Sequence, residues 1–170
     1  HKAVIDSGEI KKGDLIEMSV EKEKRIAIAI HHSSTHLLHA ALREVLGDHV
    51  QQKGSLVDET KLRFDFSHDK PLTQDEIATI EKIVNQEALN NLEVKTELMK
   101  LDDAMKSGAM ALFGEKYDDD VRVLTMGENS YSVELCGGTH VSRTGELGFF
   151  TITSQSSVAS GRRRVEAIAG

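Results

Sequence analysis

Two short histidine motifs, far apart in the chain, constrain its fold more than any other feature of the sequence. Residues 32–36 read His-Ser-Ser-Thr-His and residues 136–140 read Cys-Gly-Gly-Thr-His, so each motif places two metal-binding side chains four positions apart. Three imidazole nitrogens and one thiolate form a donor set that a tetrahedral Zn²⁺ takes. If one metal joins both pairs, the residues between positions 36 and 136 must fold back so that the motifs meet.

The composition excludes several classes of protein. The chain has 170 residues, 39% of them hydrophobic, which is enough for one compact domain or one domain plus a fragment. A formal charge of −7 argues against a generally basic nucleic-acid-binding surface. The single cysteine excludes an internal disulfide and predicts a reducing, cytoplasmic setting.

The ends of the sequence and its apolar runs carry two further expectations. No apolar run reaches the roughly 18 residues of a membrane span, and the first residues lack the pattern of a signal peptide, so we expect no membrane partner. His1 is not a natural start residue, so we expect this chain to be cut from a longer one.

Hydrophobic periodicity predicts both strands and helices. The predicted strands are residues 14–20, 24–30, 62–67, 92–99, 121–126, 130–135, 149–152 and 164–168, of which the first two form a hairpin. The predicted helices are residues 33–46, ending at Gly47, a long helix from the capping box at 73–76 to about residue 90, and a short helix at 102–107. This mixture predicts an α+β fold in which a mainly antiparallel sheet packs against two substantial helices.

Each motif has alternatives when it is considered alone. His32 and His36 lie one above the other on a helix, but this spacing also occurs by chance on helix surfaces. Position 33 is Ser rather than Glu, which argues against a zinc protease. Cys136 could be a buried thiol in a glycine turn, or the nucleophile of a pair with His140. The two motifs together favour a metal, because a Cys–His nucleophilic site would leave His32 and His36 unexplained. His39, on the same polar face of the helix, could lie behind the metal ligands, but we expect it to be solvated.

Six segments of the chain, from about residue 13 to its end, resemble the editing domain of alanyl-tRNA synthetase in the order of that family. They read HHSSTHLLHAAL at 31–42, QKGS at 52–55, LRFDF at 62–66, GAMALFGEKY at 108–117, ELCGGTH at 134–140 and GRRRVEAIAG at 161–170. Threonyl-tRNA synthetase editing domains and freestanding alanyl-tRNA editing proteins share the paired motifs. The segment at 108–117 is more similar to the full synthetase than to the freestanding forms.

The resemblance implies a function, a set of site residues and a domain organisation. It implies hydrolysis of the ester that joins a wrong amino acid, serine or glycine, to the tRNA for alanine. It implies zinc ligands at His32, His36, Cys136 and His140, and an editing pocket at Thr35, Gln52 and Ser55, which with Cys136 form the predicted catalytic set. Residues 1–30 would be a remnant of a barrel-like subdomain and residues 31–170 the editing domain. The aminoacylation domain would precede residue 1, and a tRNA-binding and oligomerisation region would follow residue 170.

The chemistry of proofreading is compatible with these residues. A site that activates alanine cannot exclude glycine by size, because one methyl group contributes only about 1–3 kcal/mol, and it rejects an added hydroxyl poorly. A second, hydrolytic site can spare alanine if polar groups bind the hydroxyl of serine, since alanine leaves each of them unpaired at a cost of about 1–3 kcal/mol. Thr35 could instead cap its helix, and Ser55 could lie in a turn.

The metal has two possible roles, and the contact with tRNA has several candidate residues. The metal could activate water and polarise the ester, or hold the α-amino group, and the thiolate ligand favours positioning. A domain that contacts only a single-stranded 3′ end needs a local basic groove, for which the candidates are Arg143, Arg162, Arg163 and Arg164. In a strand, Arg163 could simply point to solvent. The alternatives are a zinc-stabilised structural or tRNA-binding module without catalysis, and a Cys-dependent hydrolase.

Overall fold

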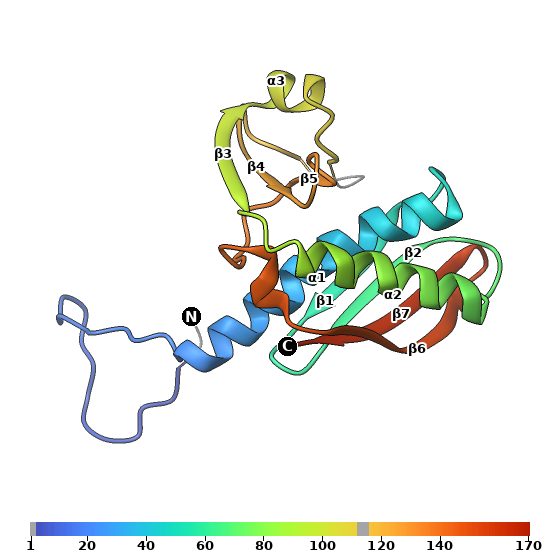
Figure 1. Cartoon of the computed structure of the whole chain (residues 1–170). Helices are drawn as coiled ribbons and strands as arrows, with labels where there is room; N and C mark the ends of the chain where they lie inside the picture. The colour runs from blue at the N-terminus through green and yellow to red at the C-terminus, as the bar shows by residue number, and fades with distance from the viewer. Residues whose placement is uncertain (1–2, 112–115) are drawn as a thin grey trace.

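The computed structural model describes residues 3–111 and 116–170, which form two antiparallel sheets and three α-helices (Figure 1). The larger sheet has four strands in the order β1-β2-β7-β6, and the smaller has three in the order β3-β4-β5. The helices are α1 (Lys22–Leu46), α2 (Gln74–Leu89) and α3 (Leu101–Lys106), with a short 3₁₀ turn, η1 (Thr144–Leu147). The strands are β1 (Gln52–Val57), β2 (Leu62–Ser67), β3 (Lys95–Lys100), β4 (Asp120–Met126), β5 (Ser132–Leu135), β6 (Phe150–Ala159) and β7 (Arg162–Ala169). The predicted α+β class is confirmed.

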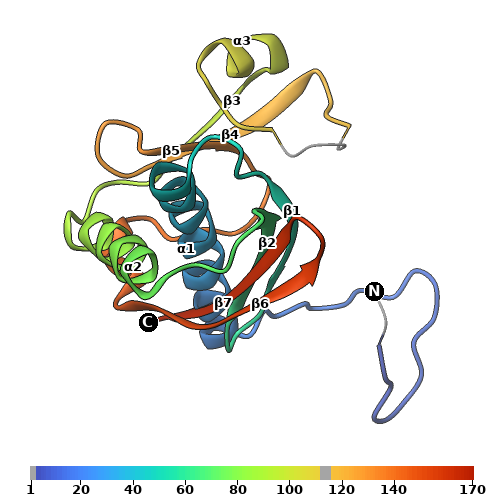
Figure 2. The ribbon, with the colours of Figure 1, turned by 90° about the vertical axis from the view of Figure 1, so that its right-hand side faces the viewer.

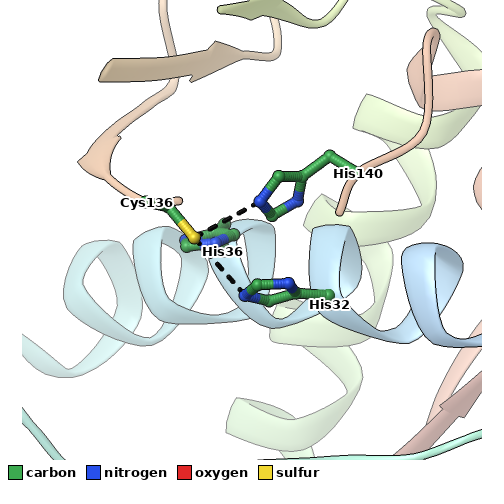
Figure 3. Close-up of side chains that lie close together, drawn as sticks. All are labelled: His32, His36, Cys136 and His140. Carbon is green, nitrogen blue, oxygen red and sulfur yellow. Dashed lines mark hydrogen bonds between the residues drawn. The ribbon is translucent and has the colours of Figure 1, made fainter. Parts of the chain in front are cut away.

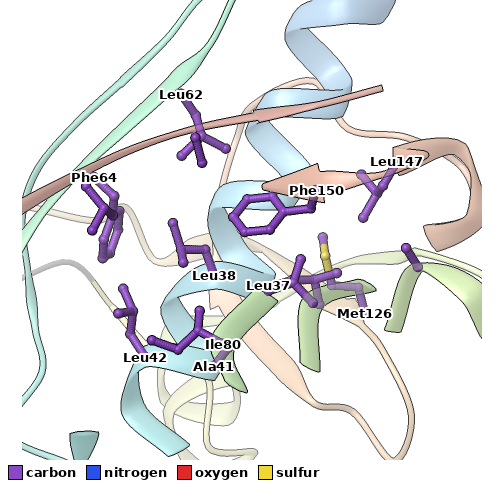
Figure 4. Packing of buried hydrophobic residues seen from close by; sticks show 14 of the residues in the cluster. Leu37, Leu38, Ala41, Leu42, Leu62, Phe64, Ile80, Met126, Leu147 and Phe150 are labelled. Carbon is purple, nitrogen blue, oxygen red and sulfur yellow. The ribbon is translucent and has the colours of Figure 1, made fainter. Parts of the chain in front are cut away.

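Helix α1 lies between α2 and the larger sheet, and this position explains its unusual burial (Figure 2). Nearly every residue from His31 to Leu42 is buried, including polar ones, because α1 contacts α2, the large sheet, η1 and β5. The core between the helices and the sheet contains Leu38, Phe64 and Phe150, all fully buried (Figure 4). The polar residues of α1 are therefore held by packing on all sides, which suits a functional site.

The predicted hairpin at 14–20 and 24–30 is wrong. Residues 14–20 adopt no regular secondary structure, and residues 22–30 form the first turns of α1. Ile26, Ile28 and Ile30 alternate with Ala27 and Ala29, and this alternation imitates a strand. Alanine is the strongest helix former, however, and no Gly, Pro or Asn interrupts residues 21–30 to make a turn. The division of the chain at residue 30 stays a prediction.

Several local signals are confirmed. Helix α1 ends at Gly47, whose φ of 113° is a conformation that favours glycine. Helix α2 begins at Thr73 with the predicted capping box, in which Thr73 and Glu76 bond each other's backbone N–H groups. The last two strands exist but are longer than predicted, because β6 and β7 pair with each other as a hairpin along most of their length.

The smaller sheet has a core of its own and leads into the second histidine motif. Val121, Val123 and Leu135 pack with Ala104 of α3 and Ala109 in this second cluster. Strand β5 ends at Leu135, so Cys136 and the glycines emerge from the edge of the small sheet toward α1. Within the described ranges, no helix is both long and apolar enough to cross a bilayer.

Candidate metal centre

The two histidine motifs meet in space and form one cluster. Helix α1 supplies His32 and His36, and the segment after β5 supplies Cys136 and His140 (Figure 3). Their ligand atoms all lie within 4.8 Å of one another. The Cys136 Sγ is 3.5 Å from His32 Nε2 and 3.3 Å from His140 Nε2. The predicted convergence of residues about a hundred positions apart is thus present in the fold.

The geometry of this cluster fits a tetrahedral zinc ion. Zn–S and Zn–N bonds of about 2.3 and 2.0–2.1 Å at a tetrahedral angle separate sulfur from nitrogen by about 3.5 Å, close to both distances observed. The Nε2 atom of His36 is buried and has no hydrogen-bond partner among the described residues. A buried nitrogen without a partner costs free energy unless something binds it, and a metal at the centre of the cluster would do so.

Contacts outside the cluster hold two of the imidazoles with Nε2 facing inward. The His36 Nδ1–H donates to the Glu134 carboxylate at 2.7 Å. The His140 Nδ1 lies 3.2 Å from Ser33 Oγ, which also accepts the backbone N–H of Val141 at 3.1 Å. A partner on Nδ1 fixes the tautomer and leaves the Nε2 lone pair for a metal, as in many zinc sites.

Gly138 is needed where it stands. A Cβ atom at this position would lie 2.1 Å from His32 Cε1 and 2.6 Å from His32 Nδ1, far closer than atoms can approach. A Cβ at the neighbouring Gly137 would meet nothing within 4 Å. The two glycines therefore differ in role, since only Gly138 makes room for the ring of His32.

Glu134 connects two histidines of α1 and was missed from the sequence. Its carboxylate accepts from His36 Nδ1 at 2.7 Å and from His39 Nδ1 at 2.9 Å, and all three side chains are buried. The expectation that His39 is solvated is therefore wrong, because α1 is covered on the face that carries it. A usable signal existed: alternate residues of a strand face the same side, and Glu134 lies two positions before Cys136.

Neighbouring charges and hydrogen bonds shift the pKa values of His36, Cys136 and Glu134. Burial opposes the charge of His36, but the Glu134 carboxylate and the neighbouring thiolate outweigh it and raise the pKa of His36 to about 10. Burial also opposes a thiolate at Cys136, but hydrogen bonds from His140 and His32, with His36 close by, lower its pKa to about 3. Burial would raise the pKa of Glu134, yet His36 and His39 lower it to about 2. The thiol is thus already in the form that binds a metal.

The structure places the three predicted pocket residues differently. Thr35 is buried in the middle of α1, where its hydroxyl donates to the His31 carbonyl at 2.9 Å, so it does not cap the helix. Gln52 lines a cavity of about 300 Å³ together with His39, Arg43 and Glu134. Ser55 is exposed on β1, inside a strand rather than a turn. Of the three, Gln52 thus shares a cavity with Glu134, which accepts a hydrogen bond from His36.

The four predicted tRNA-contacting arginines are in unlike environments. Arg162 is exposed, whereas Arg163 is only 9% exposed, which corrects the expectation that it points to solvent, and it donates to Gln155 at 3.1 Å. Arg164 makes a bidentate pair with the Asp65 carboxylate at 2.7 and 2.8 Å across β2 and β7. Arg143 is exposed and bonds Asn91. Arg162 and Arg143 are thus the more accessible of the four.

A second cavity lies beside Cys136. Its volume is about 410 Å³, and Cys136, Gly137 and Arg122 contribute to its lining. Arg122, a further residue that the sequence did not single out, donates to the carbonyls of the loop that carries Cys136. The resembling segment at 108–117 contributes Met110 and Ala111 to the first cavity, while its residues 112–115 lie outside the described ranges.

Comparison with known proteins agrees with the cluster. Residues 121–166 match the family described as "Threonyl and Alanyl tRNA synthetase second additional domain". Over its whole length the chain is 55% identical to the alanine–tRNA ligase of Ruthia magnifica, 56% to that of Cupriavidus necator and 54% to that of Rhodopseudomonas palustris. It covers 20%, 19% and 20% of these relatives, respectively.

The chain thus spans about a fifth of the length of the curated relatives that it matches. The family match includes Cys136 and His140, and the relatives align with the whole chain, including His32 and His36. We conclude that this chain belongs, as a segment, to the alanine–tRNA ligase family.

Proposed function

We propose that this chain is the proofreading part of an alanine–tRNA ligase and hydrolyses the ester of Ser-tRNA and Gly-tRNA of the alanine acceptor. The main support is the cluster of three imidazoles and one thiolate. Cys136 of this cluster lines one cavity, and Glu134, the hydrogen-bond partner of His36, lines another. The relationship to alanine–tRNA ligases supplies the substrate class. Activation of alanine, the flanking domains that would perform it and bind tRNA, and a cytoplasmic location are further parts of this proposal.

Each residue of the centre has a role in this proposal. His32, His36, Cys136 and His140 would hold zinc, and Glu134 and Ser33 orient two of the imidazoles. Zinc bound there would supply an electrophilic centre that can hold an α-amino group or polarise an ester carbonyl. Gln52 reaches the cavity beside Glu134, and its amide can bind the hydroxyl of serine, so that alanine leaves it unpaired.

The remaining predicted residues have secondary roles in this proposal. Thr35 and Ser55 stay predicted members of the pocket, with Thr35 acting from its buried position beside His36. Arg143 and Arg162 are the more accessible candidates for phosphate contacts. Arg143, Arg163 and Arg164 all have hydrogen-bond partners within the chain, but of these three only Arg143 is exposed. Cys136 acts as a ligand in this scheme rather than as a nucleophile.

One experiment tests the proposal directly. The chain is incubated with Ser-tRNA, Gly-tRNA and Ala-tRNA of the alanine acceptor, with and without a chelator. We expect hydrolysis of the first two, sparing of the third and loss of activity on chelation. The Cys136→Ala variant should be inactive, and Gly137→Ala, whose new methyl meets nothing within 4 Å, is the matched control. Full activity of Cys136→Ala would contradict the proposal.

Two other functions have specific observations in their favour. Four protein ligands close the coordination sphere, as in structural zinc sites, so a non-catalytic module would lose its fold together with its metal. The low pKa of Cys136 and its contact with His140 also suit a nucleophilic cysteine. Such a hydrolase would tolerate a chelator but not alkylation of the thiol, the opposite of what we expect.

A further inference from the structure

The loop that carries Cys136 is held by one side chain of the small sheet. The Nη1 of Arg122 donates to the Cys136 carbonyl at 3.2 Å and to the Gly138 carbonyl at 2.5 Å. Its Nη2 donates to Thr96 Oγ1 on β3 at 3.4 Å. The guanidinium thus connects β3 to the carbonyls of Cys136 and Gly138, the first and last residues of the segment 136–138. Cys136 is a proposed metal ligand, and Gly138 is the glycine that packs on His32.

The main chain of Arg122 holds the same loop. Arg122 lies on β4, the central strand of the small sheet, between the buried residues Val121 and Val123. The ladder between β4 and β5 runs as far as Val123 and Leu135, and the Arg122 carbonyl then accepts the Cys136 N–H at 3.0 Å. Arg122 therefore holds the Cys136 N–H through its backbone carbonyl, and the carbonyls of Cys136 and Gly138 through its side chain.

This loop must be placed accurately. Gly138 packs so closely on His32 that a single added methyl would overlap the ring. Glycine pairs leave the backbone free to adopt many conformations, so the required conformation has to be imposed from outside. A planar guanidinium with donors in fixed directions can impose it better than a flexible ammonium group.

We propose that Arg122 is a positioning residue of the metal centre, which sets the loop so that Cys136 reaches the metal while Gly138 clears His32. This assignment rests on the metal centre of the proposed function and adds a residue that acts on the ligands without touching the metal or the substrate. Outer partners of metal ligands typically change metal affinity by about 10–100-fold, and we expect Arg122 to fall in this range.

The test compares Arg122→Met, Arg122→Lys and Lys100→Met in the whole chain. Lys100 lies on the same small sheet in an exposed pair with Asp120, so its variant removes one positive charge without touching the loop. Three quantities are measured: zinc affinity by competition with a chromophoric chelator, melting temperature with and without zinc, and the rate at which iodoacetamide alkylates Cys136, the chain's only cysteine.

We expect Arg122→Met to weaken zinc binding about 10–100-fold and to speed alkylation of the zinc-loaded protein, with the melting temperature of the zinc-free protein nearly unchanged. Arg122→Lys should restore part of the affinity, and Lys100→Met should match the wild type. Wild-type affinity in Arg122→Met, or an equal loss of melting temperature with and without zinc, would overturn the assignment. A wild type that binds zinc but spares Ser-tRNA would overturn the proposed function alone, and one that binds no zinc would overturn both.

Discussion

The contrast between the two adjacent glycines gives the sharpest test of the metal centre. In Gly138→Ala the new Cβ would lie 2.1 Å from His32 Cε1, whereas ordinary contact begins at 3.4 Å, so the ring or the loop must move by about 1.3 Å. Zinc–ligand distances vary by only about 0.2 Å, so a shift of this size removes His32 from the coordination sphere. If the loop moves instead, Cys136 moves with it.

The loss can be expressed as a change in zinc affinity. Altering an outer partner of a ligand costs about 10–100-fold, so losing the ligand itself should cost more than about 100-fold, or about 2.7 kcal/mol of binding free energy. The assay is a competition titration with a chromophoric chelator, together with the visible spectrum of the Co²⁺-substituted protein, which reports tetrahedral coordination. Gly137→Ala is the control and should bind like the wild type, because its Cβ enters open space.

Two results would refute this reasoning. Zinc affinity of Gly138→Ala within threefold of Gly137→Ala would mean that His32 is not a ligand. An unchanged tetrahedral Co²⁺ spectrum in Gly138→Ala would mean that the cluster tolerates the displacement, and that the close contact between Gly138 and His32 does not affect metal coordination.

Three further outcomes follow from the structure. Zinc binding must release a proton from His36, whose pKa is about 10, but no proton from Cys136, whose pKa is about 3. Zinc affinity should therefore rise about tenfold per pH unit between about pH 7 and 9. Glu134→Gln should flatten this rise, and calorimetry in buffers of different ionisation enthalpy would detect the proton. Phe64→Ala should lower the free energy of unfolding by about 3–5 kcal/mol in urea titrations, against under about 0.5 kcal/mol for the exposed Leu98→Ala. Thr73→Ala should cost about 1 kcal/mol in the same assay, through loss of the capping box of α2.

The cluster was predictable from the sequence because ligand chemistry is selective. Three histidines and the only cysteine, in two pairs of the same spacing, have few explanations other than a shared metal. The convergence of the two motifs could therefore be expected without knowing how the chain folds between residues 36 and 136. Local signals were equally dependable where one short contact decides the structure, as at Gly47 and Thr73. The prediction for the first half of α1 was wrong for the opposite reason. An Ile/Ala alternation is compatible with a strand and with a helix, and packing decided between them.

The partners of the ligands were predictable only in part, because they depend on packing between distant segments. Strand alternation places Glu134 on the same side as Cys136, but nothing within α1 indicates that His39 is covered or that it meets Glu134. Arg164 likewise reads as a free cation until the register of β2 and β7 places it opposite Asp65. Sequence patterns therefore identified the groups that would bind a metal, whereas the groups that orient them required the fold.

The same partners bear on whether zinc stabilises the fold or serves catalysis. Two ligands come from α1 and two from the segment after β5, so zinc would link the small sheet to the helical layer. Glu134 and Ser33 cross the same junction by hydrogen bonds that need no metal. We therefore expect a chelator to remove activity while most of the melting temperature is kept, and Glu134→Gln to make the melting temperature depend on zinc much more strongly. Unfolding of the wild type on chelation would show that these hydrogen bonds cannot hold the junction, and would favour a structural zinc.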